Sequence, residues 1–320
     1  MRKTLILASL LIIALSCGRR GGSGQQAVLT RSFPRVEVPA MITDPSEQLV
    51  YILDHYWDGF FAGDWPTDSA VVLGVPSSEV NDNISLYVAL LDKLPVPEAQ
   101  ARLKSAFSKI QARQQKDTSS LFYLLFTESL ASCLYDPNSP LRSEDLYLPF
   151  VEGMVGSGFT PPDRLAGYRF ELEKCRLNPY GSKVPDFKFK DASGRMHHLY
   201  GEKAGYTMLF FSNPGCTACK EIIDEIGSRA YVPDMIKRGE LAIVNIYIDD
   251  EVDKWREYEP SYPRDWVNGY DFSQIINSDA LYYVRAIPSL YLLDSQKRVI
   301  YKDAPVERVL LFLDDIQTNQ

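Results

Sequence analysis

Residues 207–221 read TMLFFSNPGCTACKE, an apolar run followed by a turn, two cysteines three positions apart and a charged, helix-prone stretch. The apolar run predicts a buried strand, because it is short and ends at Asn, Pro and Gly. A strand that leads through this turn into a helix places Cys216 at the helix N-terminus. Free amide groups and the helix dipole stabilise an anion there, and Lys220 adds positive charge, so a thiolate is favoured at Cys216.

Cys219 follows Cys216 by about one helical turn. At that spacing its sulfur can attack a mixed disulfide formed at Cys216 and release the bound partner. The pair therefore indicates a redox-active dithiol. A permanent structural disulfide is an alternative, although it would close a loop too short to stabilise the fold much.

A zinc site is a further alternative and would need four ligands, usually supplied as two such pairs. The spare candidates are Cys133, Cys175, His55, His197 and His198. Only the two adjacent histidines are close in sequence, and we interpret them as surface or strand residues at a hairpin edge. We therefore expect neither a metal nor a cofactor.

The second half of the chain alternates between strand and helix patterns. Its expected strands are 186–189, 196–200, 206–212, 241–249, 289–294 and 298–304, and its expected helices are 216–230 and 306–316. This alternation predicts an α/β domain over residues 178–320.

Three segments of this domain, VPDFKF (184–189), TMLFFSNPGCTACKE (207–221) and AIPSLYLLD (286–294), resemble the thioredoxin fold. They are similar in particular to envelope thiol-disulfide oxidoreductases of the TlpA/ResA type. The resemblance covers about residues 184–318 and implies a central mixed sheet flanked by helices.

This resemblance also implies roles for individual residues. Cys216 and Cys219 would be the catalytic pair, acting on a protein or peptide dithiol or disulfide. Pro288 would follow a cis peptide bond, and Ile287 and Pro288 would bind the backbone of an extended substrate. A reducing or isomerising enzyme of this type needs a thiol protein in the membrane as its electron donor, and we favour that direction by analogy.

The chain departs from the family pattern at several positions. Gly215 replaces the tryptophan that precedes the first cysteine in thioredoxins, and Phe210 replaces the buried acid that accepts a proton there. The dipeptide between the cysteines is neither that of typical reductants nor that of strong oxidants, which leaves the direction of electron flow open. A peroxiredoxin-type peroxidase shares this fold, but the proline of its motif is not found at the required position before Cys216.

A substitute proton acceptor could be Asp249 or Asp250 at the end of the 241–249 strand, or Glu221. Strand C-termini border sites in α/β sheets, which favours the two aspartates. Ordinary solvated carboxylates are the alternative for these residues. The aromatic residues of 254–270 could line a groove for an apolar partner, but packing onto the domain is the favoured interpretation.

The first half of the chain predicts an all-α domain over residues 44–177. Asp44 can cap the first helix, with Pro45 in its first turn and Glu47 in the position of a capping box. Breaker-rich clusters separate the helices expected near 44–60, 83–94, 97–115, 119–134, 142–155 and 160–176.

Two segments of this half, YDPNSPLRSEDLYLPFVE (135–152) and NPYGSKVPDF (178–187), resemble a domain of unknown function. That domain precedes thioredoxin-like domains in some Gram-negative lipoproteins. Cys133 and Cys175 lie on apolar helix faces, where buried free thiols are the favoured interpretation. A disulfide between them is the alternative, and sequence cannot test its geometry.

The N-terminus predicts a lipoprotein signal over residues 1–16. Arg2 and Lys3 precede an apolar run that is too short to cross a membrane. Ala14-Leu15-Ser16-Cys17 resembles the bacterial lipobox, which implies lipidation of Cys17, attachment to the membrane through lipid and a periplasm-facing place in the cell envelope. A glycine-rich, polar flexible tether is expected over residues 17–43.

The composition excludes one class of partner and leaves two classes of function. The 320-residue chain has a formal net charge of −8 and no Lys/Arg block, so we expect no nucleic-acid binding. An envelope thiol-disulfide oxidoreductase is the leading hypothesis. The alternative is a lipid-anchored protein that binds a partner or glycan and carries a vestigial thioredoxin-like scaffold.

Overall fold

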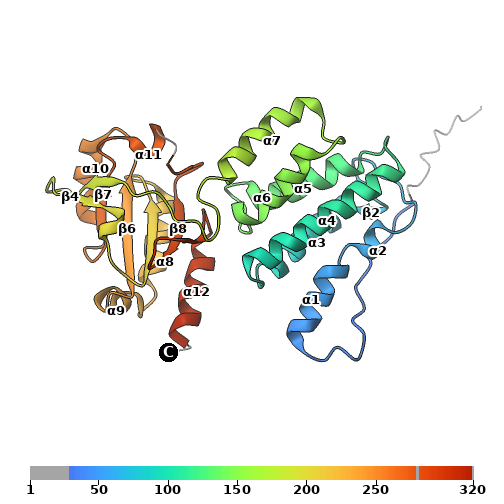
Figure 1. The fold of residues 1–320 in the computed structure, drawn as a ribbon, viewed down its shortest axis with the longest axis horizontal. Coiled ribbons are helices and arrows are strands. Elements are labelled where there is room, and N and C mark those ends of the chain that lie inside the picture. The colour runs from blue at the N-terminus through green and yellow to red at the C-terminus, as the bar shows by residue number, and fades with distance from the viewer. Residues whose placement is uncertain (1–28, 279–280, 319–320) are drawn as a thin grey trace, which may run out of the picture.

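The computed structural model describes residues 29–278 and 281–318. Figure 1 shows two lobes side by side, one built of helices and the other of a sheet flanked by helices. The predicted signal peptide at 1–16 and the lipidation site Cys17 lie outside the described residues. Within the described part, no helix is both long and apolar enough to cross a membrane.

The helical lobe follows the breaker clusters of the sequence. Its helices are α1 (Pro45–His55), α2 (Asp58–Phe61), α3 (Ser77–Leu91), α4 (Val96–Lys116), α5 (Phe122–Tyr135), α6 (Glu144–Gly156) and α7 (Pro162–Cys175). The expected cap of α1 is confirmed, because the Asp44 carboxylate accepts hydrogen bonds from the amides of Ser46 and Glu47 at 2.9 and 3.0 Å. These bonds satisfy amides that have no partner inside the helix.

Aromatic side chains dominate the core of this lobe. The largest of its buried side chains are Trp57, Tyr87, Tyr147, Phe60, Phe122, Phe126 and Phe150. Many of these rings meet edge to face, as Trp57 and Phe126 do at a centroid distance of 4.9 Å. Such pairs add to the stabilisation that burial of their area provides.

A small hairpin, β1 (Val71–Val72) and β2 (Val75–Pro76), interrupts the helices. Leu73 and Gly74 form its turn with φ of 50° and 75°, as a two-residue turn with positive φ at both positions requires. Sequence analysis did not predict this hairpin, because strands of two residues carry no periodicity that could be detected.

The prediction of a flexible tether over residues 17–43 is wrong for the C-terminal end of that segment. Arg31 donates its amide to the carbonyl of Gly74 at 2.8 Å and its guanidinium to the carbonyl of Phe60 at 2.6 Å. The ring of Phe33 stacks on Phe60 at 5.2 Å. These contacts hold the segment before α1 against the helical lobe, and single-residue contacts of this kind leave no pattern in the sequence.

The second lobe contains a sheet with the strand order β4-β3-β7-β6-β5-β8-β9. Its strands are β3 (Lys188–Lys190), β4 (Met196–His198), β5 (Tyr206–Phe211), β6 (Leu241–Tyr247), β7 (Val267–Tyr270), β8 (Ser289–Asp294) and β9 (Val299–Tyr301). The sheet is mixed, since β5, β6 and β7 run parallel while β8 pairs antiparallel with β5.

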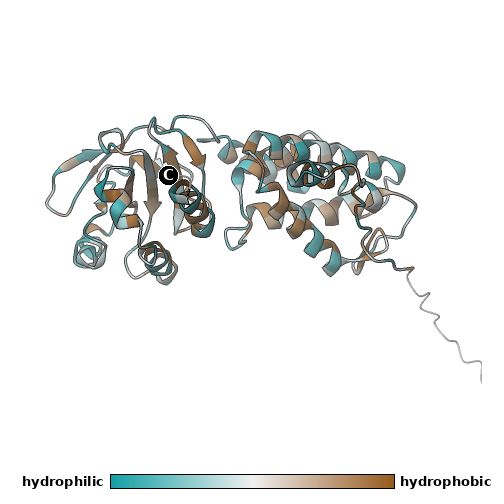
Figure 2. Ribbon diagram, turned by 90° about the horizontal axis from the view of Figure 1, so that it is seen from below, coloured by the Kyte–Doolittle hydropathy of each residue, from teal (hydrophilic) through white to brown (hydrophobic). Residues whose placement is uncertain are grey.

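Helices cover both faces of this sheet. They are α8 (Thr217–Gly227), α9 (Val232–Lys237), α10 (Val252–Tyr258), α11 (Ile275–Ser278) and α12 (Val306–Thr318), with 3-10 turns at Leu199–Gly201 and Glu259–Ser261. Along β5, Met208 and Phe210 pack with α8, α9 and α12, whereas Leu209 and Phe211 belong to the core on the opposite face. Because both faces are buried, the strand reads as a continuous apolar run, and Figure 2 shows apolar residues along the central strands.

The aromatic residues of 254–270 pack onto the domain, as the favoured interpretation predicted. Trp255, Tyr262 and Tyr270 form a buried cluster with Tyr247 of β6, and Trp266 joins the core beneath α8. Their side chains are therefore not available to line a groove.

Candidate dithiol site

Cys216 and Cys219 are joined by a disulfide at the start of α8, with their Cα atoms 5.2 Å apart. Cys216 is the N-cap residue of the helix, and its sulfur accepts a hydrogen bond from the amide of Cys219 at 3.1 Å. The predicted position at a helix N-terminus is confirmed. When the pair is reduced, the same amide and the helix dipole stabilise a thiolate on Cys216.

The two sulfurs of the pair differ in access. Cys216 is partly exposed, whereas Cys219 is 2% exposed and belongs to the core beneath α8. An incoming disulfide can therefore reach Cys216 but not Cys219. This asymmetry matches one attacking and one resolving cysteine.

Gly215 gives the turn before the pair its shape. Its φ of +71° lies in the left-handed region, where a side chain is strained. A glycine thus stands in place of the tryptophan of thioredoxins at a position whose backbone favours glycine. The departure noted in the sequence has this local physical reason.

Ile287 and Pro288 lie beside the dithiol, and the peptide bond between them is cis, as the resemblance implies. Both residues line a groove of about 520 Å³ together with Ala218, which stands between the two cysteines. The structure therefore brings together the sequence-predicted pair and the sequence-predicted backbone-binding residues.

The three candidate proton acceptors lie in different surroundings. Asp249 is exposed and accepts a hydrogen bond at 2.8 Å from the side chain of Asn213, within the turn that leads to Cys216. Glu221 lines the groove beside Ala218. Asp249 and Asp250 both line a separate hollow at the end of β6.

Lys220 was expected to add positive charge near Cys216, but a neighbouring carboxylate offsets its charge. Its ammonium group pairs with Asp224 at 2.6 Å, and this hydrogen bond raises the pKa of Lys220. Both side chains are more than 60% exposed, and such pairs contribute little energy. The helix N-terminus, rather than Lys220, is thus the main source of positive potential at Cys216.

A row of hydrogen-bonded, buried polar side chains lies behind the turn that leads to Cys216, and the sequence analysis did not predict it. Ser212 donates to Asn245 at 2.6 Å, Asn245 donates to Asn268 at 3.1 Å, and Asn268 donates to the carbonyl of Pro263 at 3.0 Å. These bonds fix the end of β5 from which the turn to Cys216 departs. The sequence signal that could have revealed this hydrogen-bonded row is Asn245, a polar residue inside an apolar strand.

The seam between the two lobes contains a buried ionic cluster, which the sequence also did not reveal. The carboxylate of Glu144, at the start of α6, contacts Lys302 at 2.6 Å and Arg285 at 3.2 Å. Arg285 also pairs with Asp303 at 2.7 Å, and Asp303 accepts a hydrogen bond from Ser289 at 2.9 Å. Since Ser289 directly follows the cis-proline, these contacts link the helical lobe to the loop that carries the cis Ile287–Pro288 bond.

The histidines do not form a metal site. His197 contacts Glu202 and Asp191 at 3.1 Å each, and His198 contacts Asp186 at 2.9 Å. Among the described residues, no group of His, Cys, Asp and Glu could hold a metal ion. These contacts fix the β3–β4 hairpin instead.

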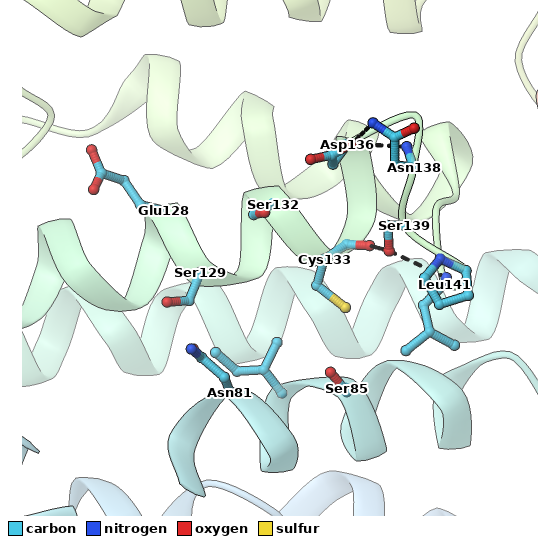
Figure 3. A pocket seen from close by; sticks show the side chains of 12 residues that line it. Asn81, Ser85, Glu128, Ser129, Ser132, Cys133, Asp136, Asn138, Ser139 and Leu141 are labelled. Carbon is cyan, nitrogen blue, oxygen red and sulfur yellow. Dashed lines mark hydrogen bonds between the residues drawn. The ribbon is translucent and has the colours of Figure 1, made fainter. Parts of the chain in front are cut away.

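Cys133 and Cys175 are both free, so the disulfide considered between them does not form. Cys175 is buried, and its burial raises the pKa of its thiol. Cys133 is half-buried and lines a hollow of about 560 Å³ between α3 and α5. Figure 3 shows its sulfur directed toward Ser85 among polar side chains. Burial raises the pKa of this thiol as well.

The fold and the site define the class: a thioredoxin-like domain, with a Cys-x-x-Cys pair at a helix N-terminus, preceded by a helical domain. The chain belongs to the family described as a domain of unknown function, DUF5106, whose model matches residues 16–178. No curated protein matches the chain.

Solved structures extend this comparison to the thioredoxin-like half of the chain. A thioredoxin-like protein from Bacteroides caccae is 30% identical, covers 89% of this chain and 99% of its own, and has a TM-score of 0.74. The C-terminal domain of an uncharacterized protein from Bacteroides fragilis is 38% identical over 43% of this chain and 99% of its own, with a TM-score of 0.42. The thioredoxin domain of a thiol-disulfide oxidoreductase from Bacteroides vulgatus is 17% identical over 43% of this chain and 96% of its own, with a TM-score of 0.37.

Proposed function

We propose that the protein exchanges thiols and disulfides with protein substrates through Cys216 and Cys219, as an enzyme of the TlpA/ResA type. One observation carries the proposal. An accessible cysteine at a helix N-terminus is bonded to a buried cysteine one turn later, beside the cis Ile287–Pro288 bond.

The reaction of the reduced pair begins with the Cys216 thiolate. It attacks one sulfur of a substrate disulfide, forms a mixed disulfide, and displaces the other substrate sulfur as a thiolate. Cys219 then loses its proton and attacks the sulfur of Cys216, which releases the substrate as a dithiol. Two electrons pass to the substrate, and the protein is left with the disulfide of the structure.

Ile287 and Pro288 would hold the backbone of the substrate while this exchange occurs. Two carboxylates border the motif and could accept the proton of Cys219. Asp249 reaches the turn through Asn213, and Glu221 lines the groove. Asp250 neither contacts the turn through Asn213 nor lines the groove, and is the least suited of the three candidates.

Reduction or isomerisation of substrates is the proposed direction. In the reducing role a thiol protein in the membrane must supply two electrons per cycle to regenerate the dithiol, whereas isomerisation returns the Cys216 thiolate without net electron transfer. Lipidation of Cys17 would hold the enzyme at the bacterial envelope, facing the periplasm, where protein disulfides form and persist.

The second candidate function is a partner- or glycan-binding protein with a scaffold in place of an active redox domain. The polar hollow of Figure 3 favours it, because hydroxyl, amide and carboxylate groups converge there from α3, α5 and the loop that follows α5. Sugars and polar peptides are recognised by such groups.

The redox potential of the Cys216–Cys219 pair separates the two functions. We expect a value between about −120 and −280 mV, the range of exchanging dithiols. It is measured by equilibration in glutathione buffers and mass counting of alkylated thiols. A potential well below about −300 mV would indicate a structural bridge and contradict the enzymatic proposal.

Trapping of substrates gives an independent test. Cys219→Ser keeps the attacking thiol and removes the resolving one, so mixed disulfides with substrate proteins should accumulate and disappear on reduction. Cys216→Ser should trap no partner. Equal recovery of disulfide-linked partners with both variants would contradict the proposed roles.

A further inference from the structure

The groove beside the dithiol is formed by both lobes. Pro137, Asn138 and Arg142 of the helical lobe face Ala218, Glu221 and the cis-proline across it. The helical domain therefore supplies a wall of the cavity in which a substrate would contact Cys216.

The groove continues along the seam between the lobes. A second hollow of about 470 Å³ shares Arg142, Pro305 and Glu307 with the first. Its apolar lining includes Leu141 and Leu311, and Leu311 of α12 is 62% exposed. The shared residues place the two hollows next to each other along the seam, and the first borders Ala218 between the two cysteines.

The loop that forms the helical wall is held in one shape, as Figure 3 shows for its first part. The Asp136 carboxylate accepts hydrogen bonds from the amide and the side chain of Asn138 at 2.8 and 3.2 Å. The Ser139 hydroxyl donates to the carbonyl of Cys133 at 2.6 Å and accepts from the amide of Leu141 at 3.2 Å. A loop with these bonds presents a preformed surface rather than one that must order on binding.

The wall is also fixed relative to the thioredoxin-like domain. Arg142 donates to the carbonyl of Asp303 at 3.1 Å, and the buried cluster around Glu144 and Arg285 lies directly beneath. Opening the seam would break the contacts of Glu144 with Lys302 and Arg285 together with that of Arg142. These contacts therefore hold the two walls of the groove in place relative to each other.

The rim of the groove is acidic. Glu221 and Glu307 are exposed, and neither forms an ion pair within the described part of the chain. Glu225 is already paired with Arg229 at 3.1 Å, and Arg142 is engaged with backbone carbonyls. Two uncompensated carboxylates therefore face the space through which a substrate segment would run.

We propose that this seam groove binds an extended polypeptide segment of the substrate, with a basic side chain near the reacting cysteine and an apolar side chain further along. The basic side chain pairs with Glu221 and Glu307, and the apolar one covers Leu311 in the second hollow. This inference rests on the proposed thiol-disulfide exchange and gives the helical domain a part in substrate selection.

The test uses the reduced full-length protein and synthetic peptides whose cysteine is capped by 4-thiopyridine. Two peptides differ only in a lysine or a glutamate next to the cysteine, and release of thiopyridine reports the rate. We expect the lysine peptide to react about 3- to 10-fold faster, as one or two exposed ion pairs would allow. Glu221→Lys/Glu307→Lys should abolish or reverse this preference.

The matched control is Glu37→Lys/Glu257→Lys, which changes the net charge equally at exposed glutamates outside the groove. It should retain the preference. Equal rates for the two peptides, or an equal effect of both double variants, would overturn the inference. The uncharged reagent 4,4′-dithiodipyridine serves as a baseline: failure of Cys216 to react with it overturns the proposed function itself.

The apolar end of the groove is tested with peptides that carry leucine or serine at successive positions from the cysteine. The wild-type protein should favour leucine at one register, and Leu311→Ser should remove that preference. Leu86→Ser, at a 52% exposed leucine of α3 outside the groove, is the control. A leucine preference that survives in Leu311→Ser contradicts the proposed second hollow.

Discussion

The two lobes carry their cysteines at opposite ends of helices. Cys216 caps the N-terminus of α8, whereas Cys133 lies near the C-terminus of α5 and Cys175 is the last residue of α7. The positive end of a helix dipole stabilises a thiolate, and the negative end disfavours it. Burial adds to the difference, since it raises the pKa of both thiols in the helical lobe. The position of a cysteine on its helix and the burial of its side chain therefore decide how readily its thiol forms the reactive thiolate.

The largest expected effect is on exchange activity. Cys216→Ala should lower the rate of disulfide exchange by about 100-fold or more, because it removes the attacking sulfur. Cys133→Ala/Cys175→Ala should retain the wild-type rate within about twofold, because neither thiol lies at the groove. Reduction of a protein disulfide, followed by thiol counting, measures both. A comparable loss in the double variant would break the contrast between the lobes.

The next effect concerns the seam at which the lobes meet. Glu144→Gln should lower the free energy of unfolding by about 3 kcal/mol, because Lys302 and Arg285 lose a buried countercharge. Glu152→Gln is the control: it removes an exposed partner of Arg176 and should cost less than about 0.5 kcal/mol. Urea denaturation measures both values. Equal costs would mean that the buried cluster does not join the lobes.

The difference in thiol reactivity should be visible as a pH dependence. A raised thiol pKa leaves less thiolate at a given pH, so Cys133 in the folded protein should react with iodoacetamide at least about tenfold more slowly than reduced Cys216 at pH 7. The rate at Cys133 should continue to rise above pH 9, while that at Cys216 should already be near its plateau. Mass spectrometry of the alkylated peptides measures both rates, and parallel pH profiles would contradict the comparison.

The smallest effect separates the two free thiols of the helical lobe. Cys175→Ala should cost about 1 kcal/mol of unfolding free energy, because the site is 1% exposed and its neighbours cannot fill the space. Cys133→Ala should cost less than about 0.5 kcal/mol, since the side chain borders an open hollow. Denaturation midpoints of the two variants provide the measurement. A larger cost at Cys133 would give this residue a structural role that its exposure does not predict.

Local patterns made part of this structure predictable. The cap at Asp44, the strand and helix on either side of Cys216, and the breaker clusters between the helices all depend on residues close in sequence. The hairpin at 71–76 was missed because its strands are too short for a pattern. The contacts of Arg31 and Phe33 were missed because each depends on a single distant partner.

The sequence by itself determined the dithiol, its place at a helix N-terminus and the two-part architecture, because strand, turn and helix signals are local. The tertiary structure alone decided which distant residues meet, such as Ser212 with Asn245, Glu144 with Arg285, and Arg142 with the groove beside Pro288. These contacts join residues whose side chains carry no mutual pattern along the chain. They form because strand pairing within the sheet and packing between the two lobes bring the residues together, and burial makes partners for their polar groups necessary.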